Sequence, residues 1–247
     1  MTNLIIGMGN VGTALYKVLK ESDPTIQTMD IKSQEVKTPV GIMHICFPYD
    51  SIFEKYVSNY ISIFKPKITV IHSTIPVGTT RRLINITKAR IAHSPVVGQH
   101  DALEKGLKTF EKWIGPSSHT VGMRLAKYFK KAGLKPKIKS SPEVTELAKL
   151  LSTYRYGLSI ARAQEEAKIC QQIDLNFAEV STEFIRMYNK GYKELGIKEV
   201  MQPNTFPGII GGHCILPNLD LLEQQYPDLI FPKAIKESNV KTIHEAD

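Results

Sequence analysis

A glycine-rich turn lies close to the start of the chain. It has the pattern G-x-G-x-x-G and comprises Gly7, Met8, Gly9, Asn10, Val11 and Gly12. An apolar segment precedes this turn and an amphipathic helical pattern follows it, a context in which the pattern indicates dinucleotide binding. The first glycine would make the tight turn, the second would let the backbone approach a pyrophosphate, and the third would let helix and strand pack closely. The N–H groups at the start of the helix would attract the phosphates.

An acidic residue, Asp30, follows the second expected strand, Thr25–Met29. A carboxylate at this place can accept hydrogen bonds from both ribose hydroxyls and repels a 2′-phosphate, so NAD is the expected cofactor rather than NADP. The nearby Lys32 keeps NADP open as an alternative. A site for FAD or another nucleotide, and a glycine turn without a ligand, are the other interpretations.

A loop that carries several hydroxyl groups, Ser73–Thr80, follows the fourth expected strand. Loops after the C-terminal ends of parallel strands line the ligand crevice of such sheets. Thr74 could therefore place its hydroxyl beside a nicotinamide or a water molecule. The alternative is a loop that only leads into a capped helix.

Two polar residues, Lys149 and Thr153, share one face of a long helical pattern because they lie four residues apart. Lys149 lies off the apolar stripe of this helix. A lysine there could act as a general acid or base, or could hold an alkoxide, provided that burial lowers its pKa. A lysine off the core stripe is more often a solvated side chain, so both interpretations stay open.

A second glycine-rich segment, Pro207–Gly212, leads to His213 and Cys214. Glycines allow close approach of a substrate, and a thiolate after such a loop could attack an aldehyde. The alternative is a buried structural cysteine. No second ligand pair at a suitable spacing accompanies these two residues, so we expect no metal site. Cys46 and Cys170 are expected in the core of a strand and of a helix.

These residues need a scaffold, and the hydrophobic periodicity predicts alternating strands and helices for the first part of the chain. The expected strands are Asn3–Ile6, Thr25–Met29, Gly41–Phe47, Ile68–His72, Arg90–His93 and Lys135–Lys139. The expected helices are Val11–Lys20, Ser51–Phe64, Thr79–Thr87 and Ser118–Ala132. This alternation predicts an α/β fold with a Rossmann-like, doubly wound parallel sheet.

A helical region follows the alternating part. Ser141 offers a capping side chain, Pro142 suits the first helical position and Glu143 suits the first turn, so a helix is expected to begin here. Its periodicity continues to about Gln172, with an apolar stripe that starts at Val144.

Another helix is expected at Phe177–Leu195, then a segment at Leu219–Tyr226 and a short helix after Pro232. We therefore expect an NAD-binding domain at residues 1–140 and a helical domain with the cysteine loop at residues 141–247.

The composition is that of a soluble globular protein. A net charge of +8 favours anionic ligands such as nucleotides. The densest lysine run, Lys127–Lys139, has no aromatic platform or nucleic-acid motif beside it, so no nucleic-acid partner is expected. No apolar run approaches the ~18 residues of a membrane helix, and no leader peptide is visible. Three cysteines are too few for a disulfide framework, which favours a reducing cytoplasm.

Taken in order, the motifs resemble those of the UDP-glucose/GDP-mannose dehydrogenase family over about residues 1–218. The residues that carry the resemblance are the glycine turn, Ser73–Gly78, Glu146–Leu150, Glu165 on the same helix and Gly211–Cys214. The Gly-Gly-His-Cys form looks most like the UDP-N-acetylmannosamine dehydrogenase branch. The resemblance implies a Rossmann domain followed by a helical domain of the 6-phosphogluconate-dehydrogenase type.

The family oxidises the primary alcohol of a nucleotide sugar to a carboxylate in two hydride transfers to NAD. The resemblance implies that Cys214 attacks the intermediate aldehyde to form a thiohemiacetal. Lys149 would stabilise the oxyanion and Thr74 would help to hold the water. It also implies a cofactor contact for Glu165 and a homodimer that pairs through Ser141–Gln172.

Three positions depart from the family pattern. The family has glutamate after a proline where this chain has Val96, asparagine in the oxyanion site where it has Thr153, and aspartate in the acid/base network where it has Asn218. Thr153 can still donate a hydrogen bond, whereas the amide of Asn218 cannot take a proton and Val96 cannot act as a base. Losing one acid/base group costs ~10²–10⁴ in rate, and thioester hydrolysis is the step affected.

Family members also carry a third α/β domain that holds much of the nucleotide, whereas this sequence reaches Asp247 soon after Cys214. The expected substrate is therefore a small anionic or sugar-like molecule, or one held in part by a partner chain. Two alternatives remain: a single-step hydroxyacid or alcohol dehydrogenase, and a non-catalytic NAD-binding protein.

Overall fold

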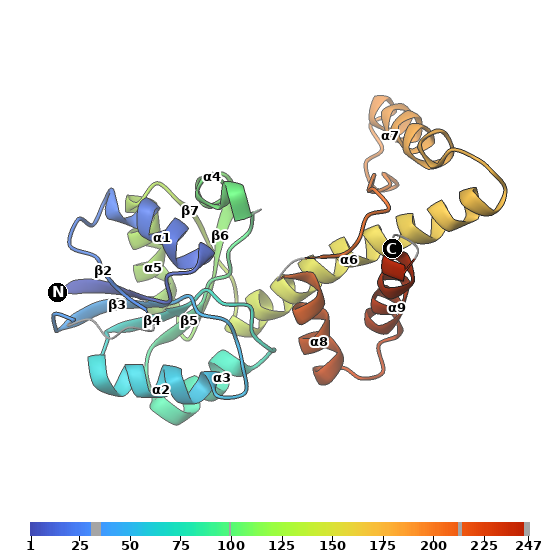
Figure 1. Cartoon of the computed structure of the whole chain (residues 1–247). Helices are drawn as coiled ribbons and strands as arrows, with labels where there is room; N and C mark the ends of the chain where they lie inside the picture. Colours follow the sequence, from blue (N-terminus) through green and yellow to red (C-terminus); the bar gives the residue numbers. More distant parts are fainter. Residues whose placement is uncertain (31–35, 99, 212–213, 245–247) are drawn as a thin grey trace. The chain divides into compact units, whose positions relative to one another are not determined.

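The computed structural model describes residues 1–247 except 31–35, 99, 212–213 and 245–247 (Figure 1). It divides into two compact units, Met1–Lys149 and Leu150–Asp247. The division falls inside the long helix α6 (Pro142–Gln172), whose first turns belong to the first unit.

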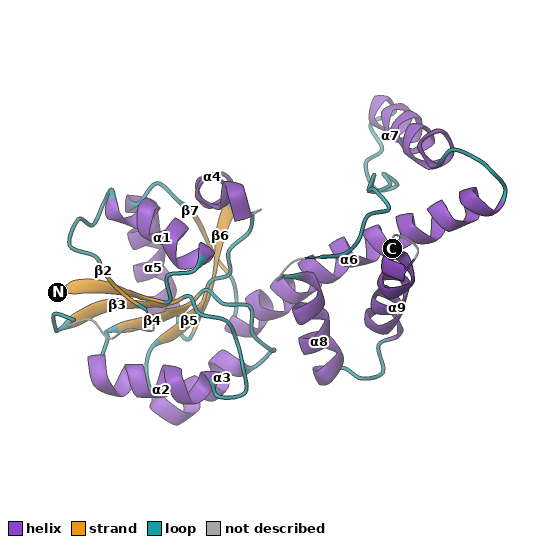
Figure 2. Cartoon of the chain, in the orientation of Figure 1, coloured by secondary structure: helices purple, strands orange, loops and turns teal. Residues whose placement is uncertain are grey.

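The first unit is built on a seven-stranded sheet with the order β2-β1-β3-β4-β5-β6-β7 (Figure 2). The strands are β1 (Thr2–Ile6), β2 (Gln27–Met29), β3 (Val40–Ile45), β4 (Ile68–Ile71), β5 (Ile91–His93), β6 (Glu111–Pro116) and β7 (Lys135–Ile138). The chain runs from β1 outward to β2 and then returns to β3 on the other side of β1. This reversal of strand order is the place where open α/β sheets bind ligands.

Helices cover both faces of the sheet. On one face α1 (Asn10–Lys20), α4 (Leu103–Thr109) and α5 (His119–Lys131) pack on a core that includes Leu15, Leu125 and Phe129. On the other face α2 (Phe53–Phe64) and α3 (Thr79–Thr87) pack on a core that includes Phe53, Val57 and Leu83. The doubly wound α/β fold expected from the sequence is confirmed.

Two details of the sheet differ from the prediction. β6 pairs antiparallel with β5, whereas the alternating pattern indicated parallel strands only. The sequence analysis also missed α4 and β6. The cause is local: β6 begins with Glu111 and Lys112, which read as a surface segment, yet Lys112 is buried.

The second unit contains the rest of α6, a turn of π-helix (Ala178–Glu183), α7 (Phe184–Glu194), α8 (Ile215–Gln225) and α9 (Ile230–His244). The helix expected at Phe177–Leu195 is thus divided in two, and α8 begins earlier than the predicted Leu219. A small core joins α6, α8 and α9; it consists of Ile160, Ala161, Ile210, Ile215, Leu219 and Ile235. A Cβ on Gly157 would lie 2.9 Å from the Ile215 side chain, so α6 and α8 pack closely there. No helix in the described ranges is long and apolar enough to cross a membrane.

The first turns of α6 bury polar rather than apolar side chains. Val144, placed on the apolar stripe by the sequence pattern, is 40% exposed, whereas Thr145 and Glu146 are fully buried. The Glu146 carboxylate accepts hydrogen bonds from the backbone N–H groups of Gly78 (2.7 Å) and Thr80 (2.9 Å) at the start of α3. This carboxylate therefore supplies partners for N–H groups that a helix start leaves unpaired.

We expect Glu146→Gln to lower the free energy of unfolding of the first unit by about 2 kcal/mol. The amide can accept only one of the two bonds and turns a donor toward the other buried N–H. Urea unfolding followed by the fluorescence of Trp113, which lies in this unit, measures the change. Glu143→Gln on the same helix is the matched control, because the Glu143–Arg81 ion pair is partly exposed and such pairs contribute less than about 1 kcal/mol. Equal effects of the two variants would contradict the expectation.

Candidate functional site

The glycine turn connects β1 to α1 and depends on two glycines. Gly7 has a φ of +92°, and a Cβ there would lie 2.8 Å from the Phe47 nitrogen. A Cβ on Gly12 would lie only 1.9 Å from the Gly7 carbonyl oxygen. Nothing lies within 4 Å of a Cβ built on Gly9, so the backbone there is open to a ligand. The three glycines have the environments that a dinucleotide turn requires.

The start of α1 is suited to an anion. Gly9 occupies the N-cap position, and the first turn holds no acidic side chain. The backbone N–H groups of this turn and the helix dipole thus favour a phosphate. Met8 and Val11 pack against the core beneath the turn, and Asn10 is exposed.

Asp30 follows β2, beside the glycine turn, because the Gly7 N–H donates to the Met29 carbonyl at 2.9 Å. Asp30 is exposed, as a carboxylate that binds a ribose must be. Lys32, which kept NADP open, lies outside the described residues. The residues present therefore fit a dinucleotide.

The loop after β4 lies at the same edge of the sheet, since β1, β3 and β4 are parallel. The Ser73 hydroxyl donates to the Phe47 carbonyl at 2.5 Å, and the Thr79 hydroxyl donates to the Pro76 carbonyl at 2.8 Å. Thr74 is half-buried in this loop. The loop is thus fixed on both sides of Thr74.

Lys149 is half-buried, and its ammonium donates a hydrogen bond to the Val96 carbonyl at 2.9 Å. The Val96 side chain is 5% exposed and belongs to the sheet core. In the loop after β5, the backbone rather than the side chain of Val96 therefore binds Lys149.

Two other candidate residues are brought together in the second unit. The Asn218 amide of α8 donates to the Thr153 hydroxyl of α6 at 3.3 Å, and that hydroxyl donates to the Leu150 carbonyl at 2.9 Å. Asn218 is 8% exposed. This amide–hydroxyl pair can donate hydrogen bonds but offers no group that titrates near neutral pH.

Cys214 occupies the N-cap position of α8 and is half-buried. Gly212 and His213 lie outside the described residues. Cys46 and Cys170 are buried, as expected, and burial raises the pKa of the Cys46 thiol to about 12. A thiol needs exposure and a low pKa to react, so Cys46 is unsuited to chemistry.

Glu165 lies on an exposed part of α6. Its carboxylate accepts from the Ser238 hydroxyl at 2.7 Å and pairs with Lys168 at 3.1 Å. These partners, Ser238 first, lower the pKa of Glu165. Within the chain this residue links α6 to α9, and its cofactor contact stays a prediction.

The sequence analysis missed a buried polar chain in the first unit. The Lys112 ammonium donates to the carbonyls of Ser94 (2.6 Å) and Pro95 (2.8 Å) and lies 3.1 Å from His72 Nδ1. His72 Nε2 lies 3.0 Å from His44 Nδ1, and His44 Nε2 lies 3.3 Å from the Tyr128 hydroxyl. The sequence signal that could have indicated this chain is a histidine in each of three expected strands, namely His44, His72 and His93.

Burial dominates the protonation of these groups. It lowers the pKa of His44 and of His93 to about 3 and that of Lys112 to about 7. The pKa of His72 is also well below its usual value, again because of burial. Among the described residues no group of three or more histidine, cysteine or acidic side chains could hold a metal ion.

The fold is also found in solved dehydrogenases that act on nucleotide sugars. It is similar to a UDP-D-ManNAc dehydrogenase from Pyrococcus horikoshii with a TM-score of 0.82, over 100% of this chain and 70% of that chain, at 18% sequence identity. No family model matches the sequence.

Similarity in sequence points to one branch of these proteins. The chain is 30% identical over 195 residues to the UDP-N-acetyl-D-mannosamine dehydrogenase of Methanococcus vannielii, covering 75% of this chain and 43% of that protein. It is 30% identical over 232 residues to the same-named protein of Methanococcus maripaludis, covering 87% and 51%. The chain thus spans about half the length of these relatives. The resemblance drawn from the motifs is confirmed.

The buried histidines predict a loss of stability in acid. An unfolded histidine has a pKa near 6.5, whereas His44 and His93 stay neutral in the folded chain down to about pH 3. Between these values the unfolded chain binds more protons, so stability is full above pH 6.5 and falls as the pH drops. We expect the unfolding free energy to fall by about 1.4 kcal/mol per histidine between pH 7.5 and 5.5.

Urea unfolding of the first unit at the two pH values, again followed by Trp113 fluorescence, measures this loss. His44→Gln should reduce the pH dependence by the share of one histidine. The exposed His119→Asn on α5 should leave it unchanged. A wild-type unfolding free energy that stays constant down to pH 5.5 would show that the buried histidines do not stay neutral in the folded chain.

Proposed function

We propose that the protein is an NAD-dependent dehydrogenase that acts on the CH–OH group of a sugar-like or nucleotide-sugar substrate. The observation that carries the proposal is the glycine turn at the reversal of strand order, with open backbone at Gly9 and Asp30 after the next strand. The similarity to nucleotide-sugar dehydrogenases over three quarters or more of the chain supports it.

In this proposal the N-terminus of α1 binds the pyrophosphate and Asp30 binds the ribose hydroxyls, which selects NAD over NADP. Thr74, in the loop after the parallel strand β4, contacts the nicotinamide end or a water. Glu165 contributes a further cofactor contact. NAD supplies the hydride acceptor when bound.

The substrate chemistry is assigned to the chain's own side chains. The alcohol gives up a hydride and a proton to become an aldehyde, and the Cys214 thiolate attacks that carbonyl to form a thiohemiacetal. A second hydride, to a second NAD, and a proton, to solvent, leave to give a thioester, and water then releases the acid and restores the thiol. Lys149 stabilises the oxyanion, Thr74 holds the water, and the Asn218 amide, paired with Thr153, offers a further hydrogen-bond donor.

A specific observation also favours a shorter reaction. Val96 is apolar and buried, so this position brings no carboxylate to assist hydrolysis of a thioester, and Asn218 brings none either. A single hydride transfer, alcohol to aldehyde or ketone, needs neither group. Single-step alcohol or hydroxyacid oxidation is therefore the second candidate.

Homodimerisation and a cytoplasmic location are part of the same proposal. Exposed apolar side chains near the C-terminal end of α6, on the residue just after it and on α7 support pairing of two copies; they are Ile169, Ile173, Phe184 and Met187. The substrate is proposed to be a small anionic or sugar-like molecule.

The test is NADH formation with a panel of nucleotide sugars, sugar phosphates and simple alcohols. We expect turnover with at least one substrate and two NADH per carboxylate, and Cys214→Ser should abolish acid formation while NAD binding persists. Cys170→Ala, at a buried cysteine of α6, is the control. One NADH per product would favour the second candidate. Tight NAD binding without any turnover would mark a non-catalytic NAD-binding protein.

The assignment of Asp30 gives a separate prediction. Asp30→Ala should raise the Kd for NAD at least about tenfold, because a charged hydrogen-bond acceptor contributes ~1.5–3 kcal/mol. The Kd for NADP should change little or fall. Titration calorimetry measures both values, and Glu21→Ala, at an exposed carboxylate of the same unit, is the control. An unchanged Kd for NAD would remove Asp30 from the site.

A further inference from the structure

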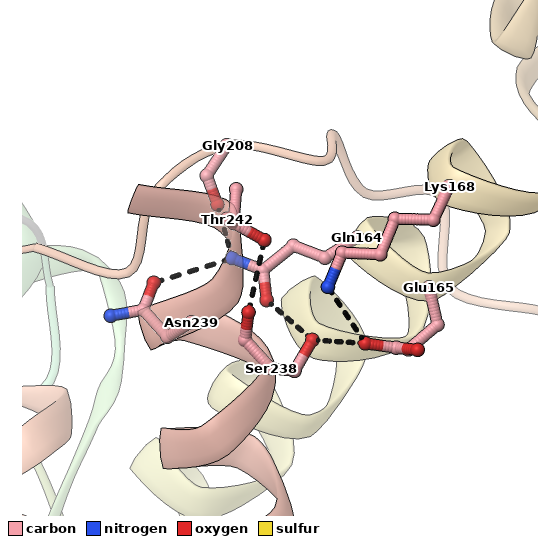
Figure 3. A network of polar contacts seen from close by, with 7 residues as sticks. All are labelled: Gln164, Glu165, Lys168, Gly208, Ser238, Asn239 and Thr242. Carbon is pink, nitrogen blue, oxygen red and sulfur yellow. Dashed lines mark hydrogen bonds and ion pairs between the residues drawn. The ribbon is translucent and has the colours of Figure 1, made fainter. Parts of the chain in front are cut away.

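A buried polar network joins α6, α9 and the segment that leads to Cys214 (Figure 3). Three of its side chains are nearly inaccessible: Gln164 and Asn239 are each 2% exposed and Ser238 is 6% exposed. All of its members lie in the second unit. None of them takes part in the chemistry proposed above except Glu165, at the edge of the network.

Asn239 binds the backbone of Ile210 through both ends of its amide. Its Oδ1 accepts from the Ile210 N–H at 2.6 Å, and its Nδ2 donates to the Ile210 carbonyl at 3.1 Å. A neighbouring strand would satisfy a backbone residue in the same way, but here one side chain does so. Ile210 is itself 2% exposed, so neither group has water as an alternative partner, and leaving them unpaired is costly.

Gln164 fixes the backbone of Gly208, two positions before Ile210. Its Nε2 donates to the Gly208 carbonyl at 2.9 Å and lies 3.3 Å from the Asn239 Oδ1. Its Oε1 lies 3.0 Å from the Ser238 hydroxyl, whose one proton is shared with the Glu165 carboxylate. The Gly208 carbonyl can only accept, so the nitrogen end of the Gln164 amide is directed at the loop.

The residues that follow Cys214 are fixed by packing. Cys214 is the N-cap residue of α8. Ile215 and Leu219 of this helix are buried in the same core as Ile210 and Ile235. Ile235 lies one turn before Asn239 on α9. The same helix therefore anchors the loop by hydrogen bonds and α8 by apolar contact.

We propose that Asn239, supported by Gln164, is a positioning residue for Cys214: it fixes the backbone of Ile210, which packs in one core with Ile215 next to Cys214, and so sets the place of the thiol. The proposal rests on the proposed function only in treating Cys214 as the nucleophile. The position of the thiol can be measured without any turnover.

The test compares Asn239→Leu, which keeps the buried volume but loses all three hydrogen bonds, with the wild-type full chain. The rate of alkylation by iodoacetamide is followed separately at Cys214 and Cys170 by peptide mass. Loss of the Ile210 contacts should raise the rate at Cys214 about tenfold through local opening. Cys170, 3% exposed on α6 of the same unit, should keep its rate and so reports that the unit stays folded.

Two further variants sharpen the result. Asn239→Asp can still accept from the Ile210 N–H but cannot donate to its carbonyl, so an intermediate rate at Cys214 is expected. Thr242→Val, on the same helix, loses only a hydrogen bond to the Ser238 carbonyl and should match the wild type. An unchanged rate at Cys214 in Asn239→Leu, or equal acceleration at Cys170, would overturn the proposal.

Once a substrate that the protein oxidises is identified, Asn239→Leu should also lower kcat about tenfold. The Kd for NAD should stay constant, because only the thiol is displaced. A fall in NAD affinity with an unchanged kcat would contradict a positioning role. If the wild type gives no turnover, the proposed function fails, and the alkylation rates still decide the role of Asn239.

Discussion

One buried carboxylate holds the candidate site of the first unit together. Glu146 has no contact with water and accepts from two backbone N–H groups at the start of α3. It lies on α6 one turn before Lys149, and the loop whose N–H groups it binds contains Thr74. A charge in such a place is stable only when its hydrogen bonds are complete. The contact therefore fixes the loop after β4 and the first turns of α6 in one arrangement.

The two units use apolar and polar contacts for different purposes. Apolar side chains pack the helices on the sheet and on one another, which sets the elements but leaves the loops undetermined. Loops are then fixed by side chains that bind their backbone, as Lys112 does at Ser94 and Asn239 does at Ile210. Such bonds do not depend on the side chain of the loop residue, so the loop sequence stays available for chemistry.

Sequence reasoning succeeded where the physical signal was local. The glycine turn, the start of α6 at Pro142 and the strand–helix alternation each depend on neighbours within about ten residues. It failed at Lys112 and β6 because hydropathy places a lysine at the surface unless its distant partners are known. The pairing of Thr153 with Asn218, 65 positions apart in the chain, could likewise not be derived from periodicity. The resemblance to a family named both residues as site positions but did not pair them.

The buried Lys112 shares a backbone oxygen with a histidine. Its Nζ and His72 Nδ1 both lie within hydrogen-bond distance of the Ser94 carbonyl oxygen, at 2.6 and 2.7 Å. That oxygen can only accept, so a neutral His72 carries its proton on Nδ1 and leaves Nε2 to accept from His44 Nδ1. His44 Nε2 then accepts from the Tyr128 hydroxyl, so one carbonyl sets the direction of the hydrogen bonds that lead from the end of β5 to α5.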